Sequence, residues 1–142
     1  MKKIIILILA VIIVSCSGDD DSSKDYSSEI LGFYELTKMT EEDGTEIDVT
    51  DMCNWATNYE FTNDDKIIET HICEDETSFF TSGYELNDDK LKWIVYDEVA
   101  PGQDYVIEYD IITLNSEKLV IRSYNDSYGD DSKTTEVYKR LN

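Results

Sequence analysis

Residues 84–96 read YELNDDKLKWIVY, and this short stretch decides the fold. Large apolar side chains alternate with polar ones on both sides of the central NDD, which is the period of a half-buried β-strand. Asparagine and aspartate tolerate left-handed backbone and bond to their own main chain, so NDD is typical of a tight hairpin turn. The stretch therefore predicts an antiparallel pair of strands, 80–86 and 90–96.

Two similar connections, 62–66 and 114–118, continue this pattern along the chain. From Ile30 onward, β-branched and aromatic residues form short runs separated by Asn, Asp, Gly and Ser, without helical periodicity of useful length. The eight strands that we expect are 32–39, 57–62, 66–73, 80–86, 90–96, 104–114, 118–124 and 133–141. This spacing indicates an antiparallel barrel or sandwich. We expect an all-β, eight-stranded antiparallel up-and-down barrel.

Alternation within the strands assigns side chains to the two faces of the sheet. The residues expected to point inward are Tyr84, Leu86, Leu91, Trp93, Val95, Tyr105, Ile107, Tyr109, Ile111, Leu119 and Ile121. Those expected to point outward are Glu85, Lys92, Glu108, Asp110 and Arg122. Leu114 should also be buried, so a bulge is predicted at Ile111-Ile112. Which face of strand 66–73 points inward stays open, because Ile67 and Ile68 lie on opposite faces.

The connections at the two ends of such a barrel differ in length. The short turns gather at one end, and the longer links gather at the other. The longer links are 40–56, 74–79, 97–103 and 125–132. One end is thus closed and the other forms a mouth, and an eight-stranded barrel has room for either packed side chains or one small molecule. The residues predicted to edge a ligand cavity are Trp55, Tyr59, Phe80, Trp93 and Tyr105.

Several strand and turn patterns resemble the lipocalin-like domain of Bacteroidetes lipoproteins. They are GFYELT at 32–37, YEF at 59–61, SGYELN with KL within 82–91, and VYKRL at 137–141. The resemblance covers nearly all of residues 30–142, although Tyr34 stands where that family usually has tryptophan, and Asp-Asp replaces its frequent Asp-Gly turns. It implies a small lipocalin-type barrel with no agreed substrate.

The N-terminal residues have the parts of a secretory signal peptide. Lys2 and Lys3 precede an apolar run, Ile4–Val14, that is too short to span a bilayer as a helix. The sequence IVSC ending at Cys16 resembles the lipobox of bacterial lipoproteins, which implies cleavage before this cysteine and lipidation of its thiol. The alternative is an ordinary signal peptide with a chance cysteine.

An acidic, serine-rich segment, SGDDDSSKDYSS, follows Cys16 and is too polar to form a core. Its Asp19, Asp20 and Asp21 resemble the surface-export signal of Bacteroidetes lipoproteins. This implies an outer-membrane, lipid-anchored protein exposed at the cell surface, and the alternative is a merely soluble linker. The predicted domains are a signal peptide (1–15), a flexible tether (16–29) and the barrel (30–142).

The net charge limits the partners. It is −20 for the chain, and removal of residues 1–15 with their two lysines makes it −22. A nucleic-acid partner is not expected, because such affinity comes largely from Lys and Arg. An acidic bilayer surface would also repel the protein, so attachment should come from acyl chains on Cys16, of which more than one is needed. We expect a monomer.

Cys53 and Cys73 are the two cysteines that lipidation leaves. Disulfides form and persist outside the cytoplasm, and both cysteines fall at the mouth end of adjacent predicted strands. We therefore expect a Cys53–Cys73 disulfide, with two free buried cysteines as the alternative.

The sequence contains no strong catalytic motif. His71 has no spaced partner, and no serine lies in a nucleophile-elbow context. The many acidic residues are more typical of solvated surface than of a catalytic pair. Residues 126–131 offer oxygen ligands for calcium but lack the alternating ligands and closing glutamate of an EF-hand loop. We therefore expect no enzyme activity, no cofactor and no metal site.

Two functions remain open at this point. The first is binding of a small apolar or amphipathic ligand inside the barrel. The second is a non-catalytic surface module with a filled barrel that contacts a partner protein. The inward residues fit both functions, and the interior volume distinguishes them.

Overall fold

The computed structural model describes residues 26–50, 56, 58–96, 104–126 and 133–142. The strands are β1 (Gly32–Glu41), β2 (Glu46–Ile47), β3 (Asn58–Phe61), β4 (Lys66–Cys73), β5 (Glu76–Asn87), β6 (Lys90–Val95), β7 (Tyr105–Leu114), β8 (Lys118–Asp126) and β9 (Thr134–Leu141). Within the described residues, no helix has the length and apolar character needed to cross a membrane.

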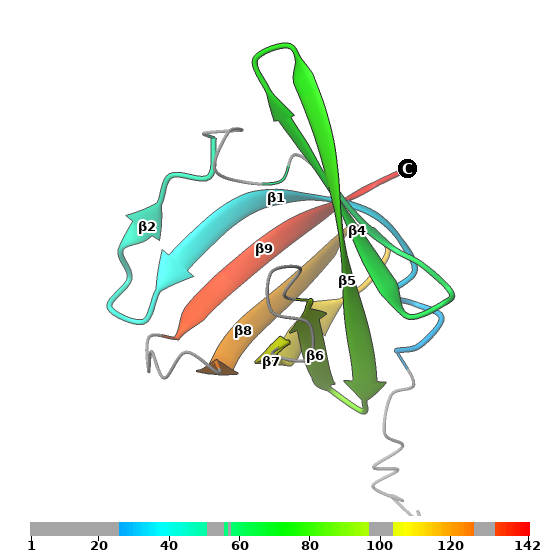
Figure 1. Cartoon of the computed structure of the whole chain (residues 1–142). Helices are drawn as coiled ribbons and strands as arrows, with labels where there is room; N and C mark the ends of the chain where they lie inside the picture. Colours follow the sequence, from blue (N-terminus) through cyan, green and yellow to red (C-terminus); the bar gives the residue numbers. More distant parts are fainter. Residues whose placement is uncertain (1–25, 51–55, 57, 97–103, 127–132) are drawn as a thin grey trace, which may run out of the picture.

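Eight of these strands form one closed antiparallel barrel (Figure 1). Each strand pairs with the next around the wall, from β1 through β3 to β9, and β9 pairs again with β1. The closing pair runs from Phe33 opposite Leu141 to Glu41 opposite Thr134. The remaining strand, β2, was not predicted and is a two-residue extension paired with β1. The predicted eight-stranded up-and-down barrel is confirmed.

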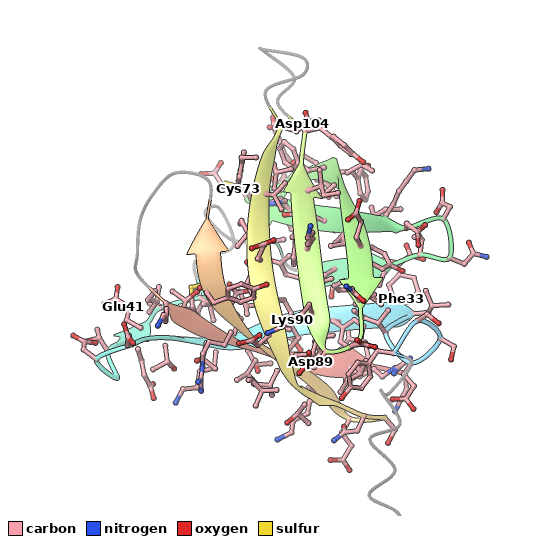
Figure 2. All side chains as sticks on the ribbon, turned by 90° about the horizontal axis from the view of Figure 1, so that it is seen from below. Phe33, Glu41, Cys73, Asp89, Lys90 and Asp104 are labelled. Carbon is pink, nitrogen blue, oxygen red and sulfur yellow. The ribbon has the colours of Figure 1, made fainter. Side chains whose placement is uncertain are left out.

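The three predicted polar turns are present. Asp65 and Asp88 adopt left-handed backbone, with φ angles of 59° and 55°, which aspartate tolerates better than most residues. Asn115 instead accepts hydrogen bonds through Oδ1 from two backbone amides of its own turn, at 2.9 and 3.0 Å. Figure 2 shows the turn at Asp89 at one end of the barrel and Cys73 at the other. The short turns therefore mark the closed end.

The link 74–79, predicted to be a long loop at the mouth, is instead part of a hairpin. β4 and β5 stay paired until Cys73 lies opposite Glu76, across a two-residue turn. Residues 76–81 are exposed, and Figure 1 shows this hairpin, in bright green, extending beyond the barrel wall. Because neither face of this part is buried, it lacks the alternation by which strands are recognised. The turn itself, Glu-Asp, has no glycine or asparagine to mark it.

The closed half of the barrel is filled with side chains. Its buried residues include Tyr34, Phe61, Ile67, Tyr84, Leu91, Leu114 and Leu119. Edge-to-face aromatic contacts join Tyr34 to Phe61, with ring centroids 5.6 Å apart, and Phe61 to Tyr84, at 5.3 Å. These side chains form the packed core of the closed half.

The segment before β1 covers the closed end. Ile30 is completely buried, and its carbonyl accepts a hydrogen bond from Tyr34 Oη at 2.9 Å. Arg140 of β9 donates to the carbonyl of Glu29 at 2.9 Å and to the carbonyl of Leu31. These contacts hold the segment against the barrel.

The predicted side-chain faces are confirmed. The predicted inward residues that are buried are Tyr84, Leu91, Trp93, Tyr109, Ile111, Leu119 and Ile121, whereas Leu86, Val95 and Ile107 pack against this core and Tyr105 is partly buried. Of the predicted outward residues, Glu85, Lys92 and Arg122 are exposed, and Glu108 and Asp110 are partly exposed. The predicted bulge is also present, because the β7–β8 register shifts between Ile111 and Thr113. This shift leaves Ile112 exposed and returns Leu114 to the core.

Candidate functional site

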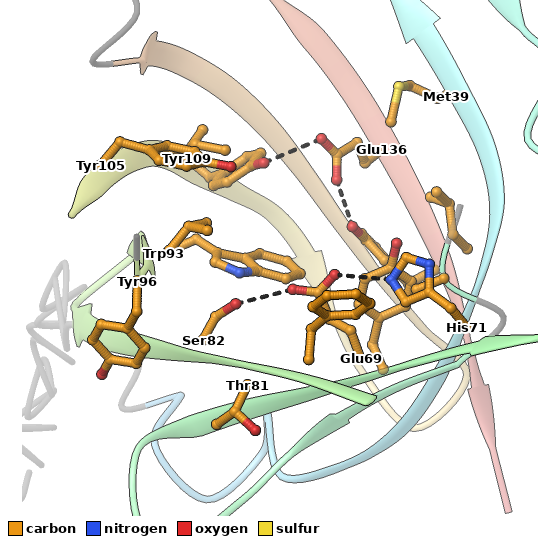
Figure 3. A pocket seen from close by; sticks show the side chains of 17 residues that line it. Met39, Glu69, His71, Thr81, Ser82, Trp93, Tyr96, Tyr105, Tyr109 and Glu136 are labelled. Atoms are coloured by element: carbon orange, nitrogen blue, oxygen red, sulfur yellow. Dashed lines mark hydrogen bonds and ion pairs between the residues drawn. The ribbon is translucent and has the colours of Figure 1, made fainter. Parts of the chain in front are cut away.

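A cavity of about 580 Å³ occupies the open half of the barrel (Figure 3). Its aliphatic lining includes Leu36, Met39, Ala56, Val95 and Ile107. Its aromatic lining includes Tyr59, Phe80, Trp93, Tyr105, Tyr109 and Tyr138. Ligand cavities in proteins commonly have volumes of roughly 300–1,000 Å³ and a mostly apolar lining with a few polar groups. The volume and the lining of this cavity fit that description.

Tyr59 organises the aromatic wall. Its ring makes edge-to-face contacts with Trp93, at 5.7 Å between centroids, and with Tyr138, at 5.1 Å. Trp93 in turn lies 6.3 Å from Tyr109. These four residues come from β3, β6, β7 and β9, and each is buried. Aromatic pairs of this geometry fix ring positions, so the wall presents well-defined ring faces.

Glu136 of β9 brings a carboxyl group into this aromatic wall. The residue is only 6% exposed. Its Oε1 accepts a hydrogen bond from Tyr109 Oη at 3.2 Å, and its Oε2 accepts one from Tyr138 Oη. Burial raises the pKa of Glu136 above its usual range. Burial and the nearby Glu136 charge raise the pKa values of Tyr109 and Tyr138 well above 10, so both phenols stay protonated as donors.

A second polar group lines the cavity from β4 and β5. Glu69 Oε1 accepts a hydrogen bond from Ser82 Oγ at 2.9 Å, and its Oε2 lies 3.7 Å from His71 Nε2. The His71 ring makes an edge-to-face contact with Phe80. Serine catalysis needs the hydroxyl to contact a base that is oriented by a third group. Ser82 donates its hydrogen bond to Glu69 and not to His71. The serine–histidine contact of nucleophilic catalysis is therefore not formed here.

The polar part of the lining is acidic. Figure 3 shows Glu69 and Glu136 directed into the same cavity, and repulsion from Glu69 contributes to the raised pKa of Glu136. Among the described residues of the lining there is no Lys or Arg, and His71 is the one side chain there that can become a cation. The cavity therefore combines aromatic surface with an excess of negative groups.

Metal binding finds no support in the described part of the chain. No group of three or more His, Cys, Asp or Glu residues there could hold a metal ion. The acidic segment 126–131, considered above for calcium, lies outside the described residues except for Asp126.

The predicted site residues divide into two groups. Tyr59, Phe80, Trp93 and Tyr105 line the cavity, and Cys73 is partly buried at the end of β4. The others lie outside the described residues, namely Cys16, Asp19, Asp20, Asp21, Cys53 and Trp55. The lipidation, export and disulfide hypotheses therefore remain predictions.

The sequence interpretation missed Glu69, His71 and Glu136 as cavity residues. Buried Ile67 sets the inward parity of β4, which Glu69 and His71 share. In the same way, Glu136 shares its parity with buried Tyr138. Acidic residues are rarely buried in a core, so the polar character of Glu69 and Glu136 predicted outward-pointing side chains. Parity alone, extended from the neighbouring large residues, is the signal that would have found them.

Comparisons with known proteins support the fold and go no further. No protein-family model matches this chain, and no curated protein matches it. A lipocalin-like protein from Bacteroides uniformis ATCC 8492 has a similar structure, with a TM-score of 0.57 and 15% identity, over 80% of this chain and 99% of that one. An uncharacterized protein from Bacteroides eggerthii DSM 20697 also has a TM-score of 0.57, with 13% identity, over 79% of this chain and 99% of that one. The chain therefore has a lipocalin-like β-barrel fold.

Proposed function

We propose that this protein is a lipid-anchored lipoprotein of the cell envelope whose barrel binds a small apolar or amphipathic molecule. The observation that carries the binding part is the aromatic-lined cavity of about 580 Å³ in the open half of the barrel. A barrel that served only as a scaffold would gain stability from filling this space, because cavities forgo dispersion contacts and apolar burial. The closed half of the same barrel is filled in that way.

The membrane part of the proposal rests on the sequence. The lipobox ending at Cys16 and the acids Asp19–Asp21 support lipidation and export to the outer surface of the outer membrane. An anchored barrel of this kind would act as a monomer that holds its ligand at the cell envelope, without catalysing a reaction.

The alternative function required a filled barrel. The cavity counts against that premise, although the exposed hairpin of β4 and β5 offers apolar side chains to a partner. Phe79 is 67% exposed and Ile72 is 37% exposed on this hairpin. Binding of a partner protein there would not exclude a ligand in the cavity.

A neutral fluorescent probe tests ligand binding. N-phenyl-1-naphthylamine emits more strongly in apolar surroundings. Its titration into the purified protein should give saturable binding, with the same detergent solution without protein as the blank. Ile107→Trp would reduce the cavity volume and should weaken binding at least about tenfold. Ile112→Trp places the same change on the outer face of the same strand, where Ile112 is 50% exposed, and should leave binding unchanged.

Native mass spectrometry provides a second readout. Protein isolated from its own host should retain a small molecule that is absent from the Ile107→Trp variant. Equal probe binding by both tryptophan variants, or no saturable binding by the wild type, would contradict the proposal.

A further inference from the structure

We infer that the ligand carries a positively charged amine, held between Glu69 and Glu136 against the aromatic wall. This inference rests on the proposed ligand-binding function and adds the chemical class of the ligand. It starts from the imbalance of ionisable groups among the described residues of the lining, where two carboxyl groups lie with a single imidazole.

The charge imbalance is local. Glu69 and Glu136 lie on β4 and β9, and both side chains point into the cavity (Figure 3). Within the described lining, the nearest side chain that can become a cation is His71, which lies 3.7 Å from Glu69 and can pair with one of the two carboxyl groups at most. A buried charge is disfavoured unless an opposite charge or hydrogen bonds compensate for it. An ammonium group in the cavity would add the opposite charge that the hydrogen bonds to these two carboxyl groups do not supply.

Both carboxyl groups have hydrogen-bonding capacity left for such a group. An ionised carboxylate has about four lone-pair sites. Glu136 accepts two tyrosine hydroxyls, one on each oxygen, and a further side-chain hydrogen bond from Thr134, and Glu69 accepts one hydroxyl, from Ser82. Each carboxylate can thus accept a further N–H donor. Glu69 is the more accessible of the two, since its side chain is 19% exposed.

The surrounding rings favour the same kind of ligand. The faces of Trp and Tyr rings attract cations, and the attraction is larger where water is excluded. Trp93, Tyr59 and Tyr109 line the same cavity as the two carboxyl groups and are buried. An anionic amphiphile, such as a fatty acid, would instead meet two like charges without a Lys or Arg among the described lining residues. The lining therefore selects a cationic head with an apolar or aromatic body.

Three matched indoles test this inference by isothermal titration calorimetry in moderate salt. Tryptamine is a cation, indole-3-propionamide is neutral, and indole-3-propionate is an anion, with similar ring and chain size. Tryptamine should bind at least about tenfold more tightly than the amide, and the propionate should bind most weakly. Glu69→Gln and Glu136→Gln should each weaken tryptamine binding by about tenfold and so remove most of its advantage over the neutral amide.

A control variant distinguishes the effect of charge inside the cavity from the effect of the overall negative charge of the chain. Glu85 lies on β5 and is exposed on the outer face, so Glu85→Gln removes one charge outside the cavity and should leave all three affinities unchanged. If it weakens tryptamine as much as Glu69→Gln does, the inference is overturned.

The two proposals can fail separately. If the naphthylamine probe binds and responds to Ile107→Trp, but tryptamine binds no better than the amide, the inference fails and the proposed function stands. If neither the probe nor any indole binds, both fail.

Discussion

Replacing Glu136 with glutamine should change how the stability of the barrel depends on pH. Burial raises the pKa of Glu136 above the ordinary value of 4.5. A carboxyl group with a higher pKa in the folded than in the unfolded protein stabilises most at low pH. That contribution is lost as the pH rises from 4.5 through the folded pKa. The loss is about 1.4 kcal/mol for each unit by which the folded pKa exceeds the unfolded one.

The variant should not show this loss, because glutamine does not ionise. Its amide can accept a hydrogen bond from one tyrosine and donate one to the hydroxyl oxygen of the other. At low pH, where the wild-type carboxyl is also neutral, the two proteins should therefore differ by about 1 kcal/mol or less. The difference in unfolding free energy, variant minus wild type, should rise with pH across the window above 4.5 and then become constant.

Urea denaturation at a series of pH values measures this difference, with tryptophan fluorescence as the signal. Trp93 is buried beside Tyr59, so its environment changes on unfolding. Glu85→Gln is the control, because Glu85 is exposed on the outer face of β5. Stability curves of the wild type and Glu136→Gln that stay parallel at all pH values would refute the reasoning.

Four further predictions concern the core, the disulfide, the lipid anchor and the export signal. Leu91→Ala should lower the unfolding free energy by about 2–5 kcal/mol in the same urea assay, because Leu91 is completely buried; a loss below about 1 kcal/mol would contradict the packing described. Alkylation of unreduced, denatured protein should find no free thiol at Cys53 or Cys73, and reduction should destabilise the fold by about 3 kcal/mol in the chain-entropy model; labelling of both before reduction would exclude the bridge. Cys16→Ser should abolish incorporation of labelled fatty acid, and normal membrane partition of this variant would exclude the anchor. Changing Asp19–Asp21 to alanine should protect the barrel from protease added to intact cells, whereas unchanged cleavage would make these acids a mere linker.

Much of the barrel could be predicted from local sequence because its turns and strands each carry their own signal. The NDD turn after Leu86 fixes where β5 ends and β6 begins, and alternation then fixes which side chains enter the core. Even the bulge at Ile112 could be predicted, because Leu114 had to be buried while Ile111 already was.

The protruding hairpin and the polar cavity could not be predicted by the same rules. Alternation appears only where one face of a strand is buried, and residues 76–79, the part of β5 that was not predicted, are exposed on both faces. The two acidic cavity residues were missed for the opposite reason. Glu136 and Glu69 occupy inward positions where the rules expect apolar side chains, and the volume between them depends on how the strands close around it. The four aromatic residues predicted for the cavity and described by the structure do line it, because each shares its strand parity with a buried residue of the same strand.

The two departures from an ideal core occur in the same half of the barrel. The open half contains both the unfilled volume and the buried carboxyl group, whereas the closed half packs apolar and aromatic side chains around Phe61. Departures of this kind are expected where function requires them. The paired measurements on Glu136→Gln decide whether that explanation holds here. Greater stability at neutral pH together with loss of the preference for tryptamine would mean that one side chain lowers stability and provides specificity, which is a stability–function trade-off. Greater stability with an unchanged preference would mean that Glu136 lowers stability without contributing to specificity, and this outcome would contradict the placement of the amine between Glu69 and Glu136.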